Sequence, residues 1–296
     1  MTDSRATQGA LLALTAAAMW GISGAIAGGV FEIVPPAYVA QVRSIIAVAV
    51  LAPYAAYRGV LRIPEKPWKF FVLGVNLALV NVTFYWAIDL LGVGPGSTIQ
   101  FLGPIMVLIW MTTIRGRAVS RIVWGAAFGA VVGVGLVTEA WTLNSSDVLG
   151  VAAGLAAALT FATYLVYGEH LASTFAPLQI TTWGFIFATL IWVVVLPLWT
   201  FPSDVPGAAW RDLVIIGVLG TAVPFIIEFK ALRMVASGIV GVVATAEPAI
   251  GAVAAAILLE QSLSRTQWIG VLVVVAAVAS VQRFGLSDVR SPTPIA

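Results

Sequence analysis

The second half of the chain repeats the first half, and this duplication limits the possible folds more than any other feature of the sequence. Residues 94–124 align with residues 238–268 after a shift of 144 positions. The identities are Gly94 with Gly238, Pro104 with Pro248, Ser120 with Ser264, Arg121 with Arg265 and Trp124 with Trp268. A shift of 141 likewise places Gly9 on Gly150. Because solenoid repeats have periods of roughly 20–50 residues, a period of nearly half the chain indicates two related halves.

The composition places both halves in a lipid bilayer. Hydrophobic residues make up 60% of the chain and charged residues 9%, with a mean hydropathy of +1.02, whereas a soluble domain has about 25% charged residues. A net charge of +2 does not indicate a nucleic acid partner. The absence of cysteine excludes disulfides and thiolate metal sites.

Ten apolar stretches have about the 20 residues that a transmembrane helix needs. They are residues 8–30, 37–57, 68–90, 95–114, 121–139, 149–169, 179–200, 210–230, 238–259 and 266–284. Proline-rich or polar segments separate them, such as residues 64–67, 144–147 and 202–206, which cannot continue a helix in lipid. The sequence therefore predicts an all-α polytopic membrane protein with ten transmembrane helices.

The basic residues predict how these helices cross the membrane. With a cytoplasmic N-terminus, the cytoplasmic side carries Arg5, Arg58, Arg62, Lys66, Lys69, Arg115, Arg117, Arg121, Lys230, Arg233, Arg283 and Arg290. The opposite side carries only Arg211 and Arg265, so the positive-inside rule places both termini in the cytoplasm. Each half has five helices, an odd number, so the second half must cross in the opposite sense. We expect inverted repeats over residues 8–140 and 148–284, followed by a disordered cytoplasmic tail, residues 285–296.

Several short motifs, in this order and spacing, resemble a known family. The tract 231–270 contains Ala231-Leu232, the small residues Ala236 to Gly238, Glu247-Pro248, Leu259-Glu260 and Gly270. The first half contains Met19-Trp20-Gly21, Pro36 with Arg43, and Ala87 through Pro104. This pattern resembles the EamA family of the drug/metabolite transporter superfamily from about residue 8 to 284, and most of all its aromatic amino acid exporters of the YddG type. The first half has Gly103 where the second has Glu247, so an acidic role there cannot be symmetric.

The resemblance implies a ten-helix transporter of the bacterial inner membrane. Its central cavity would lie between the two repeats, lined mainly by the first, third, fourth, sixth, eighth and ninth helices. Members of the family export amino acids and other metabolites. We expect no cofactor and no metal, a small-molecule substrate, and a monomer. A dimer through the glycine ridge of Gly125, Gly129 and Gly133 is the alternative.

Polar and aromatic residues on those helices are the candidate cavity lining. They are Trp20, Asn81, Tyr85, Gln100, Phe101, Tyr164, Phe225 and Thr245. An apolar pocket with a few amides and hydroxyls suits an amphipathic metabolite with an aromatic or aliphatic body. It suits a multiply charged nucleotide sugar poorly, because no cluster of Arg or Lys lies within the helices. Each residue taken alone could equally hold two helices together.

Glu247, Glu228 and Arg43 fall inside predicted helices, where each costs at least about 2.5–3.5 kcal/mol unless it is compensated. Glu247 is either a proton carrier, a partner for a substrate ammonium group, or a structural group at a helix break. Glu228 is either a coupling group facing the cavity or a structural residue near the cytoplasmic end. For Arg43 the alternatives are snorkelling, a structural pair and substrate contact. Glu169 lies at a helix end, where we expect it to be solvated.

Pro104, Pro224 and Pro248 also fall inside predicted helices. Each removes a backbone hydrogen bond and frees a carbonyl group. Within a membrane this is tolerated only where neighbouring groups or a water-filled cavity satisfy that carbonyl. The prolines therefore mark a binding site, hinges for gating, or kinks needed for packing alone.

Taken together, these features predict a secondary transporter that exports small amphipathic metabolites, above all aromatic or hydrophobic amino acids, by alternating access. No GxxxxGK[ST] motif is present, so we expect no ATP hydrolysis. Export of drugs or other metabolites is the first alternative. The second alternative is a membrane-embedded enzyme that acts on lipids, but the sequence offers no metal-ligand cluster and no catalytic pair for it. A passive channel is the third alternative. The sequence leaves open whether Glu228 and Glu247 couple transport to protons.

Overall fold

The computed structural model describes residues 2–91, 93–142, 148–258, 260 and 262–285, and the regular elements within them are all helices. The long helices are α1 (Thr2–Phe31), α2 (Pro36–Tyr57), α3 (Pro67–Leu91), α4 (Val93–Gln100), α5 (Gly103–Thr113), α6 (Arg121–Val137), α7 (Val148–Ala172), α8 (Pro177–Val195), α9 (Gly207–Gly217), α10 (Val223–Leu232), α11 (Ser237–Ala244), α12 (Ala246–Leu258) and α13 (Arg265–Ser280). Short turns complete the described chain: η1 (Ala140–Thr142), η2 (Leu198–Thr200), η3 (Val218–Ala222) and η4 (Val281–Gly285).

These helices confirm an all-α polytopic membrane protein. Nine stretches of the described chain are long and apolar enough to cross a membrane, and the shorter apolar helix α6 accompanies them. Their bounds agree with the ten predicted stretches to within a few residues. Prolines begin α2, α3 and α8, where a missing N–H costs nothing. The predicted break at residues 144–147 and nearly all of the predicted tail lie outside the described residues.

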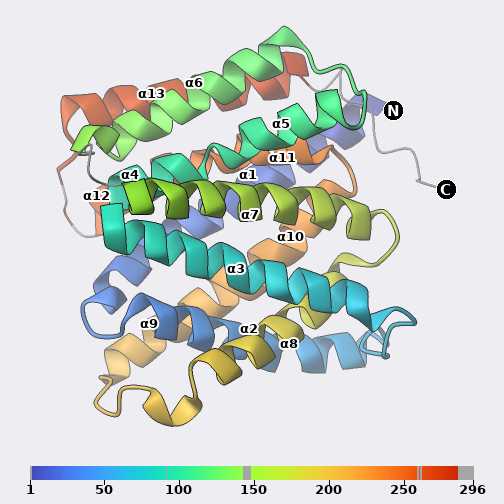
Figure 1. Cartoon of the computed structure of the whole chain (residues 1–296), viewed down its shortest axis with the longest axis vertical. Helices are drawn as coiled ribbons and strands as arrows, with labels where there is room; N and C mark the ends of the chain where they lie inside the picture. Colours follow the sequence, from blue (N-terminus) through green and yellow to red (C-terminus); the bar gives the residue numbers. More distant parts are fainter. Residues whose placement is uncertain (1, 92, 143–147, 259, 261, 286–296) are drawn as a thin grey trace.

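The helices lie side by side with roughly parallel axes, as Figure 1 shows. At one edge α6 packs on α13, and at the other edge α2 packs on α8 and α9. Between these edges α1 packs on α10 and α12, and α7 packs on α3 and α4. We call the end of the bundle where α1 begins and α13 ends the proximal end, and the opposite end the distal end (Figure 1).

Three of the membrane-crossing stretches are broken, and each break comes just before a proline that the sequence singled out. The α4–α5 break precedes Pro104, and the α11–α12 break precedes Pro248. The π turn η3 separates α9 from α10 just before Pro224. In that turn the Thr221 hydroxyl donates to the Ile216 carbonyl oxygen (2.9 Å), which satisfies part of the disturbed backbone.

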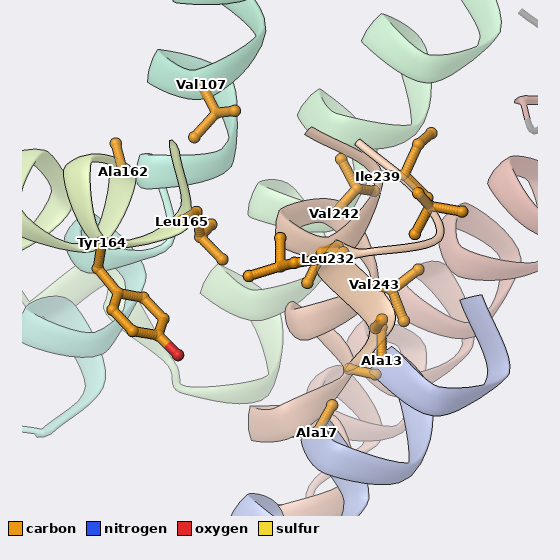
Figure 2. Packing of buried hydrophobic residues seen from close by; sticks show 14 of the residues in the cluster. Ala13, Ala17, Val107, Ala162, Tyr164, Leu165, Leu232, Ile239, Val242 and Val243 are labelled. Atoms are coloured by element: carbon orange, nitrogen blue, oxygen red, sulfur yellow. The ribbon is translucent and has the colours of Figure 1, made fainter. Parts of the chain in front are cut away.

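The apolar core extends through the bundle, and Figure 2 shows the part of it where α1, α7, α10 and α11 meet. Ala13 and Ala17 of α1 lie near Val243 of α11, while Leu165 of α7 lies beside Leu232 of α10. Small residues on α1 allow this close approach of helices. By contrast, large apolar side chains cover the outer surface, including Leu11, Val132, Leu190, Val194 and Leu272, as expected for a surface in contact with lipid.

Candidate functional site

Two adjoining chambers lie in the middle of the bundle. The inner chamber has a volume of about 140 Å³ and the outer chamber about 580 Å³, and the outer volume is typical of a small-molecule site. The residues that line both chambers are Trp20, Arg43, Phe84, Tyr85, Gln100, Phe101 and Glu247. Because the chambers share these residues, we treat them as one cavity.

The cavity opens toward the distal end of the bundle. The outer chamber is lined by Phe31 at the end of α1, Pro36 at the start of α2 and Asp89 near the end of α3. Gln267, in the first turn of α13, also lines it. These helix ends all lie at the distal end, where Phe31 and Asp89 are exposed.

Aromatic side chains form the floor of the inner chamber. Phe161, Tyr164 and Phe225 line it. Phe225 meets Trp20 and Tyr164 in edge-to-face contacts, with ring centroids 5.1 and 5.9 Å apart. Tyr164 makes a further edge-to-face contact with Phe229 on its proximal side. Such contacts hold rings in fixed orientations, so the floor is a packed aromatic layer that closes the cavity toward the proximal end.

A buried carboxyl group lies beneath this floor. Glu228 is 1% exposed and is absent from the lining of either chamber. The Tyr164 hydroxyl donates a hydrogen bond to its Oε2 atom, while Oε1 is buried without a hydrogen-bond partner among the described residues. The structure therefore links Glu228 to the cavity through the Tyr164 side chain, rather than placing it in the cavity wall.

The wall shared by the two chambers carries two residues of opposite charge, Arg43 of α2 and Glu247 of α12. The Arg43 Nη2 atom donates to the Asn81 Oδ1 atom (3.1 Å), and Asn81 donates in turn to the Leu77 carbonyl oxygen (2.7 Å). Arg43 thus forms the structural pair that the sequence allowed, and it also faces the cavity. Glu247 lies in the first turn of α12, where an acidic residue complements the helix dipole.

Seven of the eight predicted lining residues lie in the cavity wall: Trp20, Asn81, Tyr85, Gln100, Phe101, Tyr164 and Phe225. The structure does not bring Thr245 into this wall. Its side chain is fully buried, and its hydroxyl donates to the Val242 carbonyl oxygen (2.5 Å) at the α11–α12 break. A hydroxyl that bonds to the preceding turn in this way often accompanies a bend in the helix.

The three prolines occupy different places around the cavity. Pro248 lines the outer chamber, so its break opens directly onto the cavity. Pro104 is buried and packs against Gly241 of α11, which joins the break in one half to the broken helix of the other half. Pro224 is buried at the start of α10, one turn before Glu228.

Polar contacts join neighbouring helices at the proximal end. The Arg117 Nη1 atom lies 3.3 Å from the Glu169 Oε1 atom, and the Ser237 N–H donates to Glu169 Oε2 (2.9 Å). The Tyr167 hydroxyl donates to the Lys69 carbonyl oxygen (3.0 Å). We expected Glu169 to be solvated, and this was wrong: it is 9% exposed, because α11 begins beside it and supplies an N–H group.

Sequence reasoning missed several contributors to this site, three of which are aromatic or charged residues of the inner chamber. Phe84 and Phe161 line the cavity, although only their neighbours Tyr85 and Tyr164 were predicted to do so. Arg43 was not among the predicted lining residues, yet its position as the single basic residue well inside a predicted span was a usable signal.

Comparisons with known proteins agree with this geometry. The sequence model of the EamA-like transporter family matches twice, over residues 7–139 and 148–282. The uncharacterized inner membrane transporter YicL of Salmonella typhimurium is 23% identical over 92% of this chain and 94% of its own length. The threonine/homoserine exporter RhtA of Escherichia coli is 26% identical over 72% of this chain and 73% of its own.

Two further matches are more limited. Protein RarD of Salmonella typhi is 30% identical over 54% of this chain and 55% of its own length. A crystal structure of another protein superposes with a TM-score of 0.81, covering 94% of this chain and 97% of the other, at 20% identity. At that identity the superposition shows a shared fold and nothing more.

Proposed function

Since the chain belongs to the EamA-like transporter family, we propose that it is a secondary transporter that exports small amphipathic metabolites. The observation that carries this proposal is the cavity itself, which lies in the middle of the bundle, opens at the distal end and is closed at the proximal end. A site of this kind can bind a solute from one side of a membrane at a time.

Aromatic and hydrophobic amino acids are the first candidate substrates. The wall of the inner chamber combines aromatic rings with two amides, Asn81 and Gln100, and two residues of opposite charge, Arg43 and Glu247. This suits a ligand with an apolar body and a polar end. The relative RhtA is named as an exporter of threonine and homoserine, which supports amino acids as a class, while the aromatic preference rests on Trp20, Tyr85 and Phe101 alone.

We further propose that the two halves are inverted repeats, over residues 8–140 and 148–284. Gly9 meets Met234 and Val235, and Gly150 meets Leu90 and Leu91. The shift of 141 relates Gly9 to Gly150, and the shift of 144 relates Leu90 and Leu91 to Met234 and Val235. The first contact lies at the proximal end and the second near the distal end, where α7 begins (Figure 1). Equivalent contacts at opposite ends are what an inversion in the membrane produces.

In this proposal, transport proceeds by alternating access. With both termini in the cytoplasm, the described cavity faces the outside of the bacterial inner membrane. Rotation of the half-helices at Pro104, Pro224 and Pro248 would close the distal opening and open the proximal end. We propose that the protein does this as a monomer. In the glycine ridge Gly133 packs within the chain against Val274, whereas Gly125 and Gly129 face open space among the described residues, so a dimer through these two glycines is the alternative.

The test is transport by purified protein in liposomes. We expect saturable uptake and counterflow of radiolabelled phenylalanine, tryptophan or threonine, above that of empty liposomes. Export of drugs or other metabolites would appear as counterflow of those solutes without amino acid transport. Flux without counterflow would indicate a channel, and turnover of a lipid substrate would indicate an enzyme. Absence of amino acid transport would refute the proposed substrate class.

Glu228 and Glu247 are the candidates for coupling this transport to protons. Both are carboxyl groups near the cavity, and Glu228 reaches it through Tyr164. We expect Glu228→Gln or Glu247→Gln to abolish any acceleration of transport by an imposed pH gradient. An unchanged response in both variants would exclude them as proton carriers, and an unresponsive wild type would indicate facilitated diffusion.

A further inference from the structure

We propose that Arg43 and Glu247 together recognise a zwitterion, with the substrate carboxylate bound at Arg43 and the substrate ammonium group at Glu247. This inference rests on the proposed transport of amino acids. It goes further by assigning each charge of the substrate to one residue, and by making substrates with a single charge poor ligands.

The first observation is that the two charges share the cavity without pairing. Both residues line both chambers. The ion pairs within 4.0 Å between described residues are instead Arg117 with Glu169 and Arg211 with Asp212. Opposite charges kept apart inside a membrane are costly. A ligand that carries both charges would compensate the two residues at once.

The second observation concerns how Arg43 is held. One arm of its guanidinium is fixed by Asn81 (3.1 Å), which orients the group on the cavity wall. Its Nε atom is buried without a hydrogen-bond partner among the described residues. A guanidinium presents a planar fork of donors that matches a carboxylate. Arg43 is thus an oriented donor with unused hydrogen-bonding capacity.

The third observation concerns how Glu247 is placed. A Cβ atom on Gly21 would lie 2.6 Å from the Glu247 carbonyl oxygen and 2.8 Å from the Gly251 nitrogen, so α1 and α12 approach each other here to backbone contact. This contact fixes the first turn of α12, and with it the Glu247 side chain, beside the cavity. Among the described residues that side chain has no hydrogen-bond partner, so its carboxylate is available to an ammonium group.

The surroundings leave room for the rest of the substrate. Trp20, Phe84, Tyr85 and Phe101 line the same cavity and can contact an apolar or aromatic side chain. The remaining charge in the outer chamber, Asp89, is exposed at the distal opening, where water solvates it. If Glu247 holds the ammonium group, Glu228 remains as the candidate for proton coupling.

The experiment compares three probes that share one ring. Phenylalanine carries both charges, phenethylamine lacks the carboxylate, and 3-phenylpropionate lacks the ammonium group. Each probe competes with radiolabelled phenylalanine for binding to purified protein and for counterflow in liposomes. For the wild type we expect phenylalanine to bind about 10- to 100-fold more tightly than either analogue, because each analogue loses one charged hydrogen-bonding partner.

The variants should change this selectivity in opposite directions. Arg43→Gln should weaken phenylalanine binding about 10- to 100-fold and leave phenethylamine binding nearly unchanged. Glu247→Gln should weaken phenylalanine binding by a similar factor and leave 3-phenylpropionate binding nearly unchanged. The matched controls, Arg211→Gln and Asp212→Asn, alter an exposed ion pair outside the cavity and should leave all three affinities unchanged. Size-exclusion profiles check folding, and Glu247→Gln carries the test if Arg43→Gln does not fold.

The outcomes separate this inference from the proposed function. A wild type that binds and transports phenylalanine, with variants that keep the wild-type ranking of the probes, would overturn the two-charge site and leave amino acid transport intact. Equal loss of all three probes in both variants would make the residues structural, and would also overturn it. A wild type that binds none of the probes and transports no amino acid would overturn the proposed function itself.

Discussion

The two ends of the bundle are closed in different ways. At the proximal end, polar contacts join the helices that surround the cavity: Glu169 on α7 binds Arg117 and the first residue of α11, Ser237. At the distal end, polar contacts join neighbouring helices in pairs, including Thr98 of α4 with Thr138 just after α6 (2.7 Å). Ser264 binds Glu139 (2.9 Å) between α13 and the end of α6, and Gln41 of α2 binds the Trp192 carbonyl oxygen of α8 (3.2 Å). The proximal contacts close the cavity, whereas the distal contacts leave it open.

The two halves of the sequence differ at the residues that make the proximal contacts. Under the shifts of 141 and 144, Glu169 corresponds to Gly28 and Ser237 to Val93. The proximal carboxylate therefore has no counterpart at the distal end. Glu228 corresponds to Phe84 in the same way. The halves share the helix pattern, but only the second half carries a carboxyl group at the positions of Glu169 and Glu228, so we expect the proximal end to be the more strongly closed of the two.

The largest expected effect comes from Glu169→Ala. It removes the Arg117 ion pair and leaves the buried Ser237 N–H without an acceptor, which should destabilise the closed proximal end by about 3 kcal/mol. Because the chain has no cysteine, a single cysteine at the buried position Ala172 can report opening. We expect its labelling by a membrane-impermeant thiol reagent, added to the proximal side, to accelerate at least about 10-fold.

The control for Glu169→Ala is Asp212→Asn, which breaks the exposed ion pair with Arg211. Exposed pairs contribute about 0–1 kcal/mol, so labelling at Ala172→Cys should not change. Equal labelling in the Glu169→Ala and wild-type backgrounds would show that the aromatic floor, and not the polar contact, keeps the proximal end closed.

A smaller effect is expected from Tyr164→Phe. The ring remains in the aromatic floor, but the buried Glu228 loses its hydrogen-bond donor, which should cost about 2 kcal/mol. The measurement is the melting temperature of the detergent-purified protein. The double variant with Glu228→Gln should recover part of the loss, since an amide is less costly to bury than an unpaired carboxyl group. Purely additive losses would contradict a direct coupling of the two side chains.

The smallest effect is expected at the distal edge, from Ser264→Ala. The Ser264 hydroxyl accepts the Gln267 N–H (3.2 Å) and donates to Glu139, so its loss should cost about 1 kcal/mol as a helix N-cap. Melting temperature should fall slightly, while transport and proximal labelling stay at wild-type levels. Altered transport would mean that the distal edge moves during the cycle, and would weaken the distinction between the two ends.

Most of the fold could be read from the sequence, because lipid permits few arrangements of an apolar chain. The helix bounds and the breaks before Pro104, Pro224 and Pro248 followed from span length and proline chemistry. The cavity wall was harder. Arg43 and Phe161 face the cavity because of how α2 and α7 are rotated, which periodicity does not fix in helices that are apolar all round. The burial of Glu169 depends on α11, more than 60 residues further along the chain.

The helix broken at Thr245 also sets a length scale for movement. The part beyond the break, α12, has 13 residues, and at 1.5 Å per residue it is a lever of about 20 Å. A rotation of about 15° at the break would move its far end by about 5 Å, by the same geometry. That displacement is comparable with the width of an amino acid side chain. In the proposed alternating-access cycle, a small bend in the middle of the membrane would therefore move α12 far enough to narrow the distal opening.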